Sequence, residues 1–445
     1  MPWQKVSDNR WERPADGIEG YFIAMGRFSS SLCDGRVHYT LLSTLKIETG
    51  QPDTTVVPAL KRAWKQSRYE QPHLASVAAT EGDMRLIYEV PNDNTLDEWL
   101  ESTFIVSSAS DAENLYSTVE PISRATLYYL PKSSELVLRI PHYIIDGNGM
   151  LRLWHIYLKA LESPIPNIKF GDEPARLPLP MEEVHGFSKE ETPEMMEKAT
   201  AKFMSWAGSV PGIGPVSGVG TAPSGRCRQT EIRFPANTTG QLVAACKRKG
   251  VTITAAVHAA YIGAIVKYAD PKGKLSEYVT PTQFNLRRYM PEPDSERAVA
   301  VYYTPWPYKI DLPAPFWDVA KSLQQYYQTE FNDHREWLEI RGHFARVLTA
   351  TVQTPEFLAS PPPRDALVSS LGIVESLMQR TYGGFEVKDL MIGVDVVLGM
   401  SMFFMYTFQD QLRLNYSFND GFEKPEAIEM YLDEMRAILV RELLT

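Results

Sequence analysis

His142 is the residue of this chain whose surroundings point most directly to chemistry. It stands in the segment Pro141-His142-Tyr143-Ile144-Ile145-Asp146-Gly147, and of the eight histidines only His142 is followed four residues later by an aspartate. Imidazole titrates near neutral pH, so a histidine that faces a cleft can take a proton from a substrate as a general base. The alternative is an ordinary loop histidine between a strand and a helix.

The neighbouring sequence predicts how His142 would be held. Hydrophobic residues alternate up to Ile140, which is typical of a strand, and residues 150–160 are mostly apolar, which indicates a helix. Between them, Asp146-Gly147-Asn148-Gly149 can adopt turn conformations that present both backbone N–H groups and a side chain to a cleft. Asp146 has no need to touch the imidazole, because it can fix the loop by pairing with an arginine elsewhere.

Hydrophobic patterns along the rest of the chain predict a mixed α/β or α+β fold. Residues 412–418 alternate between apolar and polar types, which favours a strand with one buried face, and Pro425 begins an amphipathic final helix. Residues 208–225 hold too much glycine and proline for a helix or strand. A chain of 445 residues favours two domains. We therefore expect an N-terminal lobe at 1–206, a linker at 207–226 and a C-terminal lobe at 227–445.

Composition excludes several classes of function. The formal charge of −10 argues against a nucleic-acid partner, which requires a basic surface. No apolar run approaches the length of a membrane span, and the N-terminus lacks the apolar core of a signal peptide. Three cysteines without paired spacing favour a reducing compartment over a disulfide or zinc framework. A cytoplasmic location is therefore expected.

The segment from His142 to Gly147 resembles the HxxxDG motif of the condensation-domain and chloramphenicol-acetyltransferase-like superfamily. Three later segments are similar to further elements of that superfamily: residues 280–287 to a strand ending in Asn-x-Arg, 369–372 to a Ser-Asn-Leu-Gly element, and 406–414 to a late strand pair. Pro141 stands where condensation domains have a first histidine, and no Asp-Phe-Gly-Trp-Gly motif is present. The resemblance is therefore closest to fungal stand-alone acyltransferases, such as the trichothecene 15-O-acetyltransferases.

This resemblance implies a fold and a mechanism. The fold would be α/β, with two chloramphenicol-acetyltransferase-like lobes, each a mixed β-sheet with flanking helices, and an active-site tunnel between them. His142 would take the proton from an acceptor hydroxyl or amine as it attacks a thioester carbonyl, and a backbone N–H near Gly147 would stabilise the oxyanion. Asp146 would point away from the substrate and form a structural salt bridge with Arg287.

Other residues are weaker candidates for substrate contacts. Asn285, Ser370 and Gly372 lie in segments that carry the resemblance, and the aromatic rings of Tyr303 and Trp306 suit a polycyclic acceptor. For the two aromatic residues the alternative is packing in the core. The exposed-type run Lys247-Arg248-Lys249 is a candidate contact for phosphate groups or, alternatively, a solvated helix end.

The sequence thus predicts an acyl-CoA-dependent O-acyltransferase that acts on a small-molecule acceptor of secondary metabolism. Two alternatives stay open: an enzyme that uses a carrier-protein thioester, with the carrier acting in trans, and a non-catalytic binding protein with the same fold. No glycine-rich phosphate loop and no His/Cys cluster with ligand spacing is present, so we expect no metal and no tightly bound cofactor, with acyl-CoA as a co-substrate.

Overall fold

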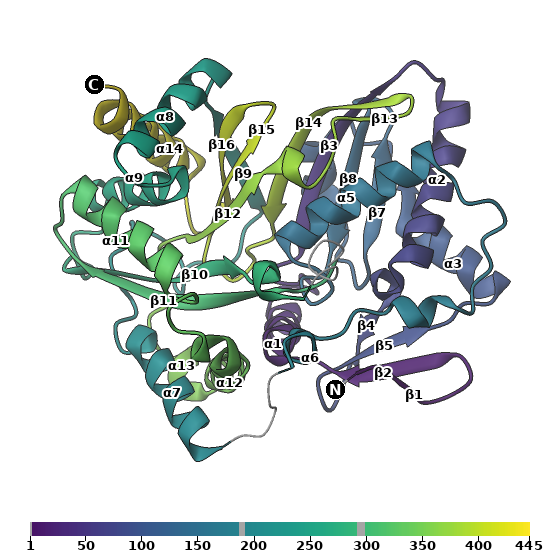
Figure 1. Ribbon diagram of the computed structural model, residues 1–445, viewed down its shortest axis with the longest axis horizontal. Helices are drawn as coiled ribbons and strands as arrows, with labels where there is room; N and C mark the ends of the chain where they lie inside the picture. The colour runs from purple at the N-terminus through teal and green to yellow at the C-terminus, as the bar shows by residue number, and fades with distance from the viewer. Residues whose placement is uncertain (1, 187–191, 292–298) are drawn as a thin grey trace. The chain divides into compact units, whose positions relative to one another are not determined.

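The computed structural model describes residues 2–186, 192–291 and 299–445 (Figure 1). These residues form two compact units that interleave along the chain. The N-terminal unit comprises Met1–Phe187, Asn285–Tyr303 and Val374–Val394, and the C-terminal unit comprises Ser188–Phe284, Thr304–Ile373 and Asp395–Thr445. The two units therefore do not follow one another along the chain as the lobes at 1–206 and 227–445 were expected to do.

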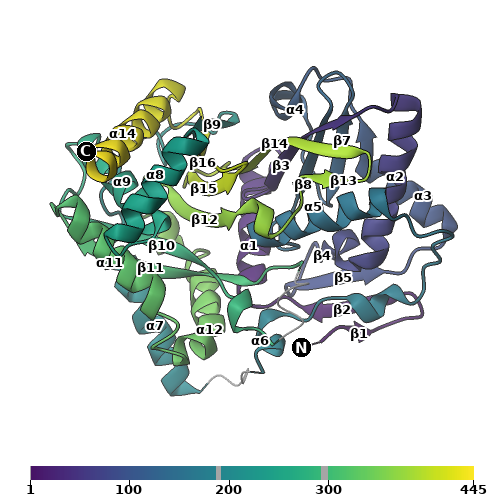
Figure 2. The ribbon, with the colours of Figure 1, turned by 45° about the horizontal axis from the view of Figure 1, so that its top comes forward.

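The main sheet of the N-terminal unit explains this interleaving. Its six strands lie in the order β13 (Thr381–Tyr382), β14 (Phe385–Val394), β3 (Leu41–Thr49), β8 (Glu135–Ile140), β7 (Thr126–Leu130) and β6 (Phe104–Val106). Strand β14 pairs antiparallel with β3 along its whole length, and Figures 1 and 2 show the two strands side by side. A late segment of the chain thus completes the sheet that the early segments begin.

Helices cover both faces of this sheet, as successive residues of β3 show. Side chains alternate between the faces of a strand. The Ser43 hydroxyl accepts a hydrogen bond from Trp154 of α5 (Gly147–Glu162), whereas Thr44 bonds to Tyr116 of α4 (Ala112–Thr118) on the opposite face. Helix α2 (Asp53–Glu70) lies beside α5. Burial on both faces explains why β8 is so rich in apolar residues.

The remaining elements of the N-terminal unit surround this three-layer core. A second sheet has the order β1 (Gln4–Lys5), β2 (Arg10–Pro14), β5 (Arg85–Glu89) and β4 (Val77–Ala78). Helix α1 (Gly17–Leu32) begins with a capping box, in which Asp16 and Glu19 each accept a bond from the other's backbone N–H. The other helical segments are α3 (Asp93–Thr103), α6 (Met181–Val184), η1 (Pro72–Ala75), η2 (Glu173–Arg176), η3 (Arg287–Tyr289) and η4 (Val374–Ser376).

The C-terminal unit has its own core between a sheet and three helices. The sheet has the order β12 (Leu367–Ile373), β15 (Met402–Phe408), β16 (Gln411–Asn419) and β9 (Cys227–Arg233). Its apolar side chains pack against α8 (Ala236–Arg248), α9 (Ile253–Lys267) and α14 (Pro425–Leu444). A two-stranded sheet of β10 (Glu277–Asn285) and β11 (Tyr303–Asp311) accompanies α11 (Phe316–Thr329), while α7 (Pro193–Ala207) packs on α12 (Glu336–Thr351) and α13 (Pro355–Leu358) follows.

Two sequence expectations are wrong within this unit. Strand β16 does not have one solvated face, because Arg413, Asn415 and Ser417 are as deeply buried as their apolar neighbours. The predicted linker at 207–226 is packed structure: Ile213 is in the core, and a Cβ added to Gly212 would lie 2.6 Å from a methyl group of Val279. The glycines here permit close backbone approach, which explains their density without a connection between domains.

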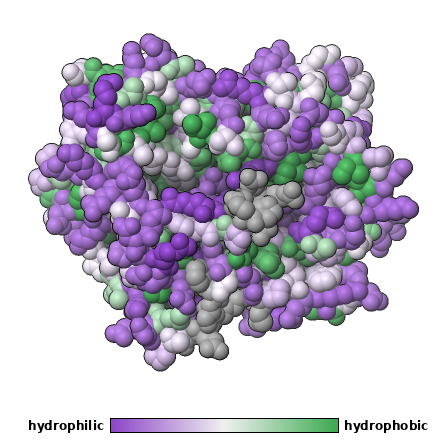
Figure 3. Space-filling model, viewed as in Figure 1, coloured by the Kyte–Doolittle hydropathy of each residue, from purple (hydrophilic) through white to green (hydrophobic). Residues whose placement is uncertain are grey.

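The surface and the helices were compared with what a membrane span requires. On the face shown in Figure 3, hydrophilic residues predominate and apolar residues form small separate patches. In the part of the chain that the structure describes, no single helix is long and apolar enough to cross a membrane. Helices α8 and α9, which meet at 98°, pass the test of length and composition only as a bent pair.

Candidate active site

His142 lies in a short turn between the end of β8 and the start of α5. The backbone N–H of Ile144 donates to the carbonyl of Pro141 at 3.0 Å, and this bond closes the turn. Pro141 and Ile144 are buried while the His142 side chain is half-buried. The strand–turn–helix arrangement that the sequence predicts around His142 is therefore confirmed, with α5 beginning at Gly147 rather than at Met150.

Asp146 is the N-cap of α5, and its side chain is 5% exposed. One carboxylate oxygen accepts bonds from the N–H of Gly149 at 2.7 Å and from Nη2 of Arg287 at 2.9 Å. The other accepts from Nη1 of Arg287 and from the N–H of Tyr302, both at 2.8 Å. Four charge-assisted bonds satisfy both oxygens, so Asp146 ties together the helix start and two distant segments of the N-terminal unit.

Arg287 is also held on several sides. Its side chain is 3% exposed and forms the expected ion pair with Asp146 in a two-pronged geometry. Nη2 also donates to the carbonyl of Ala300 at 2.9 Å, and the Asn285 side-chain oxygen accepts from the backbone N–H of Arg287 at 3.1 Å. Asn285 thus orients Arg287. This contact gives Asn285 a positional task, and a contact of Asn285 with the substrate stays a prediction.

Aromatic rings surround the imidazole of His142. The ring of Phe22 in α1 stacks on it with centroids 3.9 Å apart and planes inclined by 8°, and Tyr303 lies 5.6 Å away at 32°. Burial among these rings lowers the pKa of His142 to about 4, against the opposing effects of the Asp146 charge and the backbone of His142 and Ile145. The expectation of a pKa near neutrality is therefore wrong for this conformation, because it ignored desolvation.

The hydrogen-bonding state of the site suits proton transfer and oxyanion binding. Nδ1 of His142 is buried and, among the described residues, has no side-chain hydrogen-bond partner. The first N–H groups of a helix have no partner inside the helix. In α5 Asp146 accepts from Gly149 and Met150, so the N–H groups of Gly147 and Asn148 remain unbonded within the described ranges. A neutral imidazole and two free N–H donors therefore stand on one short segment.

The other predicted substrate contacts divide between the two units. Tyr303, beside His142, is half-buried and keeps its candidacy. Trp306 is fully buried in the C-terminal unit, where its ring contacts Phe331, Trp337 and Phe344 and its Nε1 donates to Glu330. Trp306 therefore packs in the core, which is the alternative that the sequence left open.

Ser370 and Gly372 lie on β12 in the C-terminal unit. The Ser370 hydroxyl bonds to Thr254 at 3.0 Å, and Gly372 takes a φ of +73° where the pairing of β12 with β15 shifts register. Glycine adopts such a φ without a steric cost, so a local irregularity explains Gly372.

Two structural contributors were absent from the sequence prediction. Phe22 stacks on His142 from 120 residues earlier in the chain, and the Tyr302 contribution is a backbone N–H, which no side-chain pattern reveals. The sequence can predict a buried helix that contains Phe22. It cannot predict that the Phe22 ring stacks on the His142 imidazole.

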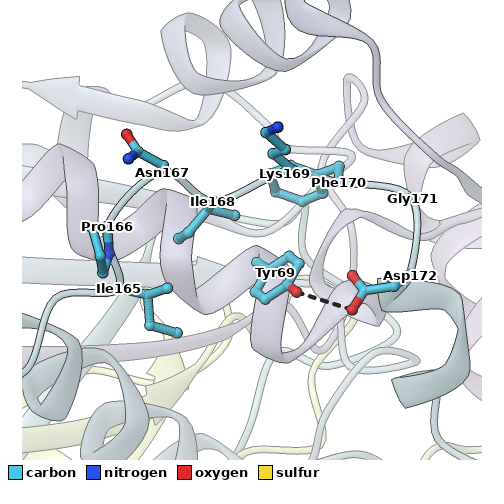
Figure 4. Close-up of a pocket in the computed structure, with 9 residues that line it drawn as sticks. All are labelled: Tyr69, Ile165, Pro166, Asn167, Ile168, Lys169, Phe170, Gly171 and Asp172. Carbon is cyan, nitrogen blue, oxygen red and sulfur yellow. Dashed lines mark hydrogen bonds between the residues drawn. The ribbon is translucent and has the colours of Figure 1, made fainter.

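A separate pocket of about 520 Å³ opens in the N-terminal unit (Figure 4). It is lined by Tyr69 of α2 and by the loop at 165–172, and the Tyr69 hydroxyl donates to Asp172 at 3.1 Å. None of the residues around His142 lines this pocket. Over the described ranges, no group of three His, Cys, Asp or Glu side chains gathers as metal ligands would.

The chain is related in sequence to fungal acetyltransferases. It is 29% identical over 463 residues to the acetyltransferase pigO of Monascus ruber, an alignment that covers 100% of this chain and 98% of that protein. It is 26% identical over 454 residues to the O-acetyltransferase pigM of the same organism, with 100% and 87% covered. No protein-family model matches the chain.

Solved structures share its fold. The trichothecene 15-O-acetyltransferase of Fusarium sporotrichioides superimposes with a TM-score of 0.84 at 17% identity, covering 99% of this chain and 97% of that one. The condensation domain of the monacolin K polyketide synthase gives 0.67 at 12% identity, with 98% of each chain covered. The predicted mixed α/β fold and its resemblance to these acetyltransferase and condensation-domain structures are confirmed.

Proposed function

We propose that this protein is an acyltransferase of secondary metabolism, which moves an acyl group from acyl-CoA to a hydroxyl of a small molecule with His142 as the general base. The relationship over the full chain to proteins named acetyltransferases supports the reaction class. One observation carries the assignment of the base: the His142 imidazole is neutral at physiological pH and lies in the turn that leads into the free N–H groups of α5.

In the proposed reaction, Nε2 of His142 accepts the proton of the acceptor hydroxyl while its oxygen attacks the thioester carbonyl. A C–O bond forms, and negative charge develops on the former carbonyl oxygen. The N–H groups of Gly147 and Asn148 are the donors that we assign to this oxyanion, with the positive end of the α5 dipole behind them. The C–S bond then breaks, the imidazolium returns its proton to the CoA sulfur, and the ester leaves.

Asp146 and Arg287 have a structural task in this proposal. All of the described contacts of the Asp146 carboxylate are to Arg287 and to backbone N–H groups, so the carboxylate fixes the turn rather than relaying a proton. His142 is positively charged only transiently, because it gives up the proton within the same catalytic cycle.

For the acyl donor, the alternative to acyl-CoA is a carrier-protein thioester. CoA carries a 3′-phosphate and a pyrophosphate, and phosphates are bound by charge-assisted contacts. Residues 247–249 are exposed cations at the C-terminal end of α8, with the Lys249 ammonium 5.3 Å from the Trp317 ring. We assign them to the phosphates. Free CoA should inhibit turnover, more weakly as salt concentration rises. Turnover with a carrier-bound thioester and no effect of CoA would establish a carrier protein as donor.

A reducing cytoplasmic location belongs to the same proposal. Cys33, Cys227 and Cys246 form no disulfide among the residues that the structure describes. Free thiols are typical of compartments that keep cysteine reduced.

The decisive experiment compares histidine variants in an acyl-transfer assay. Acetyl-CoA and a panel of phenols and alcohols are incubated with the protein, and ester products are measured by mass spectrometry. His142→Ala should lose about 10²–10⁴-fold in turnover at an unchanged melting temperature. His334→Ala, at an exposed histidine, is the matched control and should retain full activity. A His142→Ala variant that keeps more than half of the wild-type rate refutes the assignment, and absence of any transfer by the wild type favours a non-catalytic binding protein.

A further inference from the structure

A histidine that acts as a base is usually oriented by a hydrogen bond to its second ring nitrogen. No side chain gives His142 this support, because its buried Nδ1 has no side-chain hydrogen-bond partner among the residues that the structure describes, and its polar neighbours are the backbone groups of His142 and Ile145. The nearest carboxylate in sequence cannot supply it. Both oxygens of Asp146 are already occupied by Arg287 and by two backbone N–H groups. Contacts other than a carboxylate must therefore fix the imidazole plane.

The rings on either side of the imidazole are the contacts able to do so. Phe22 lies almost parallel to it, with a centroid distance of 3.9 Å and an interplanar angle of 8°. Tyr303 also contacts the imidazole and lies 6.2 Å from Phe22. Parallel stacking at van der Waals distance allows the imidazole to slide but strongly opposes tilting, so the contact with Phe22 determines the plane in which Nε2 points.

Phe22 is itself held in place by a buried charge network at the start of α1. Arg13 and Glu19, whose side chains are 2% and 4% exposed, form a two-pronged pair at 2.6 Å, and Glu19 completes the capping box with Asp16. Six residues separate Asp16 from Phe22, so the capped end and the stacking ring lie less than two helical turns apart. The orientation of Phe22 is thus tied to a rigid helix start.

Tyr39 supports the Phe22 ring from another side at a conformational cost. Its ring stands at 90° to that of Phe22 with centroids 5.9 Å apart, and the side chain is buried. Its backbone has a φ of +63°, which is rare for a bulky aromatic residue. Strained backbone of this kind persists where the surroundings require it, and it gathers at functional sites.

We propose that Phe22 is a positioning residue for His142, which holds the imidazole plane by stacking in place of the acidic partner that such a base ordinarily has. This inference rests on the proposed function of His142 as a base. It assigns to a ring contact, supported by Tyr303 and Tyr39, the orienting task that a carboxylate performs elsewhere.

The first experiment measures the His142 imidazole directly, without substrate. Histidine-labelled full-length protein is titrated by NMR, and the resonance missing from His142→Ala assigns the ring. Phe22→Leu removes the stacked ring and admits water, so the pKa of His142 should rise from about 4 toward its ordinary value of 6.5. Phe22→Tyr keeps the ring and should leave the pKa low. Phe28→Leu, six residues further along α1 and on another face, is the control that should change nothing.

The second experiment measures catalysis by the same variants. A misoriented base costs about 10–10²-fold in turnover, so Phe22→Leu should lose that much in kcat with a smaller change in KM, and its acid limb should move to higher pH. Phe22→Tyr should restore the wild-type profile. If Phe22→Leu melts too low to use, Phe22→Met carries the same expectations with closer volume. An unchanged pKa of His142, or an unchanged kcat, in a folded variant overturns the proposal.

These outcomes are separable from failure of the proposed function. Loss of the base assignment would appear as an active His142→Ala variant. The pKa measurement needs no activity, so it tests the stacking contact even in that case.

Discussion

Asp146→Asn tests how much the N-terminal unit depends on one carboxylate. Asparagine keeps the shape of the side chain but offers one acceptor oxygen, whereas the carboxylate accepts four bonds from Arg287, Gly149 and Tyr302. Its amide group would also direct N–H donors at the guanidinium or at a backbone N–H. The Arg287 charge, on a side chain that is 3% exposed, would then have no counter-charge in this cluster.

The magnitude follows from the burial of both partners. Removing one member of a buried ion pair costs about 3–5 kcal/mol in the free energy of unfolding. For a domain of this size, 1 kcal/mol corresponds to about 2–4 °C in melting temperature. Asp146→Asn should therefore melt roughly 6–20 °C below the wild type. Activity should fall with it, because the same carboxylate holds the turn that carries His142.

A double-mutant cycle distinguishes pairing from general damage. Unfolding of Asp146→Asn, Arg287→Met and the double variant is followed by urea titration. The double variant, which buries no charge at this position, should be more stable than the sum of the two single effects implies. Arg288→Met, at the exposed neighbour, is the control and should lie within about 0.5 kcal/mol of the wild type. Single variants within 1 kcal/mol of the wild type, or strictly additive effects, would refute this account of the pair.

Three further predictions concern the same structure. Gly149→Ala should lower the unfolding free energy by about 1–3 kcal/mol and reduce activity, because its Cβ would lie 2.7 Å from Ile145 and 3.0 Å from the Ala300 carbonyl. The control Gly240→Ala places its Cβ in open space and should lower neither, so equal effects of the two variants would contradict this prediction. The acid limb of kcat/KM should lie near pH 4, where His142 becomes protonated, and a limb near 6.5 would contradict the burial of the ring. Burial raises the pKa of Asp365 and of Glu423 to about 7, so the folded state holds their protons between about pH 4 and pH 7; stability should fall as pH rises through that window, less steeply in Glu423→Gln, and an unchanged slope in urea titrations would contradict it.

The local structure around His142 could be predicted because short-range rules determine it. Alternating hydrophobic residues end at Ile140, and Asp146 stands where a helix N-cap belongs. The pairing of Asp146 with Arg287 came from a family resemblance, since 141 residues separate the two and no local pattern connects them. A resemblance supplies long-range pairing that periodicity cannot supply.

Other features depended on contacts that no local pattern contains. The polar residues Arg413, Asn415 and Ser417 of β16 are buried in the folded chain, whereas alternation in the sequence suggested one solvated face. The glycine-rich segment at 207–226 packs tightly, and the backbone at Gly212 lies against Val279. Composition alone does not distinguish such close packing from a linker. The lowered pKa of His142 comes from burial in the tertiary fold, which also brings the ring of Phe22 onto the imidazole.

A single carboxylate often determines both the orientation and the pKa of a histidine base. Around His142, different groups determine these two properties. A carboxylate bonded to the second nitrogen of a histidine orients the ring but also raises its pKa, because it stabilises the charged form. Here Asp146 provides negative charge for Arg287 and a cap for α5, while the rings of Phe22 and Tyr303 restrain the imidazole and exclude water from it. In the proposed mechanism the base is therefore oriented without being made more basic. With a pKa of about 4 it would be neutral throughout the physiological range, and a proton that it accepts would be readily returned to the departing thiolate.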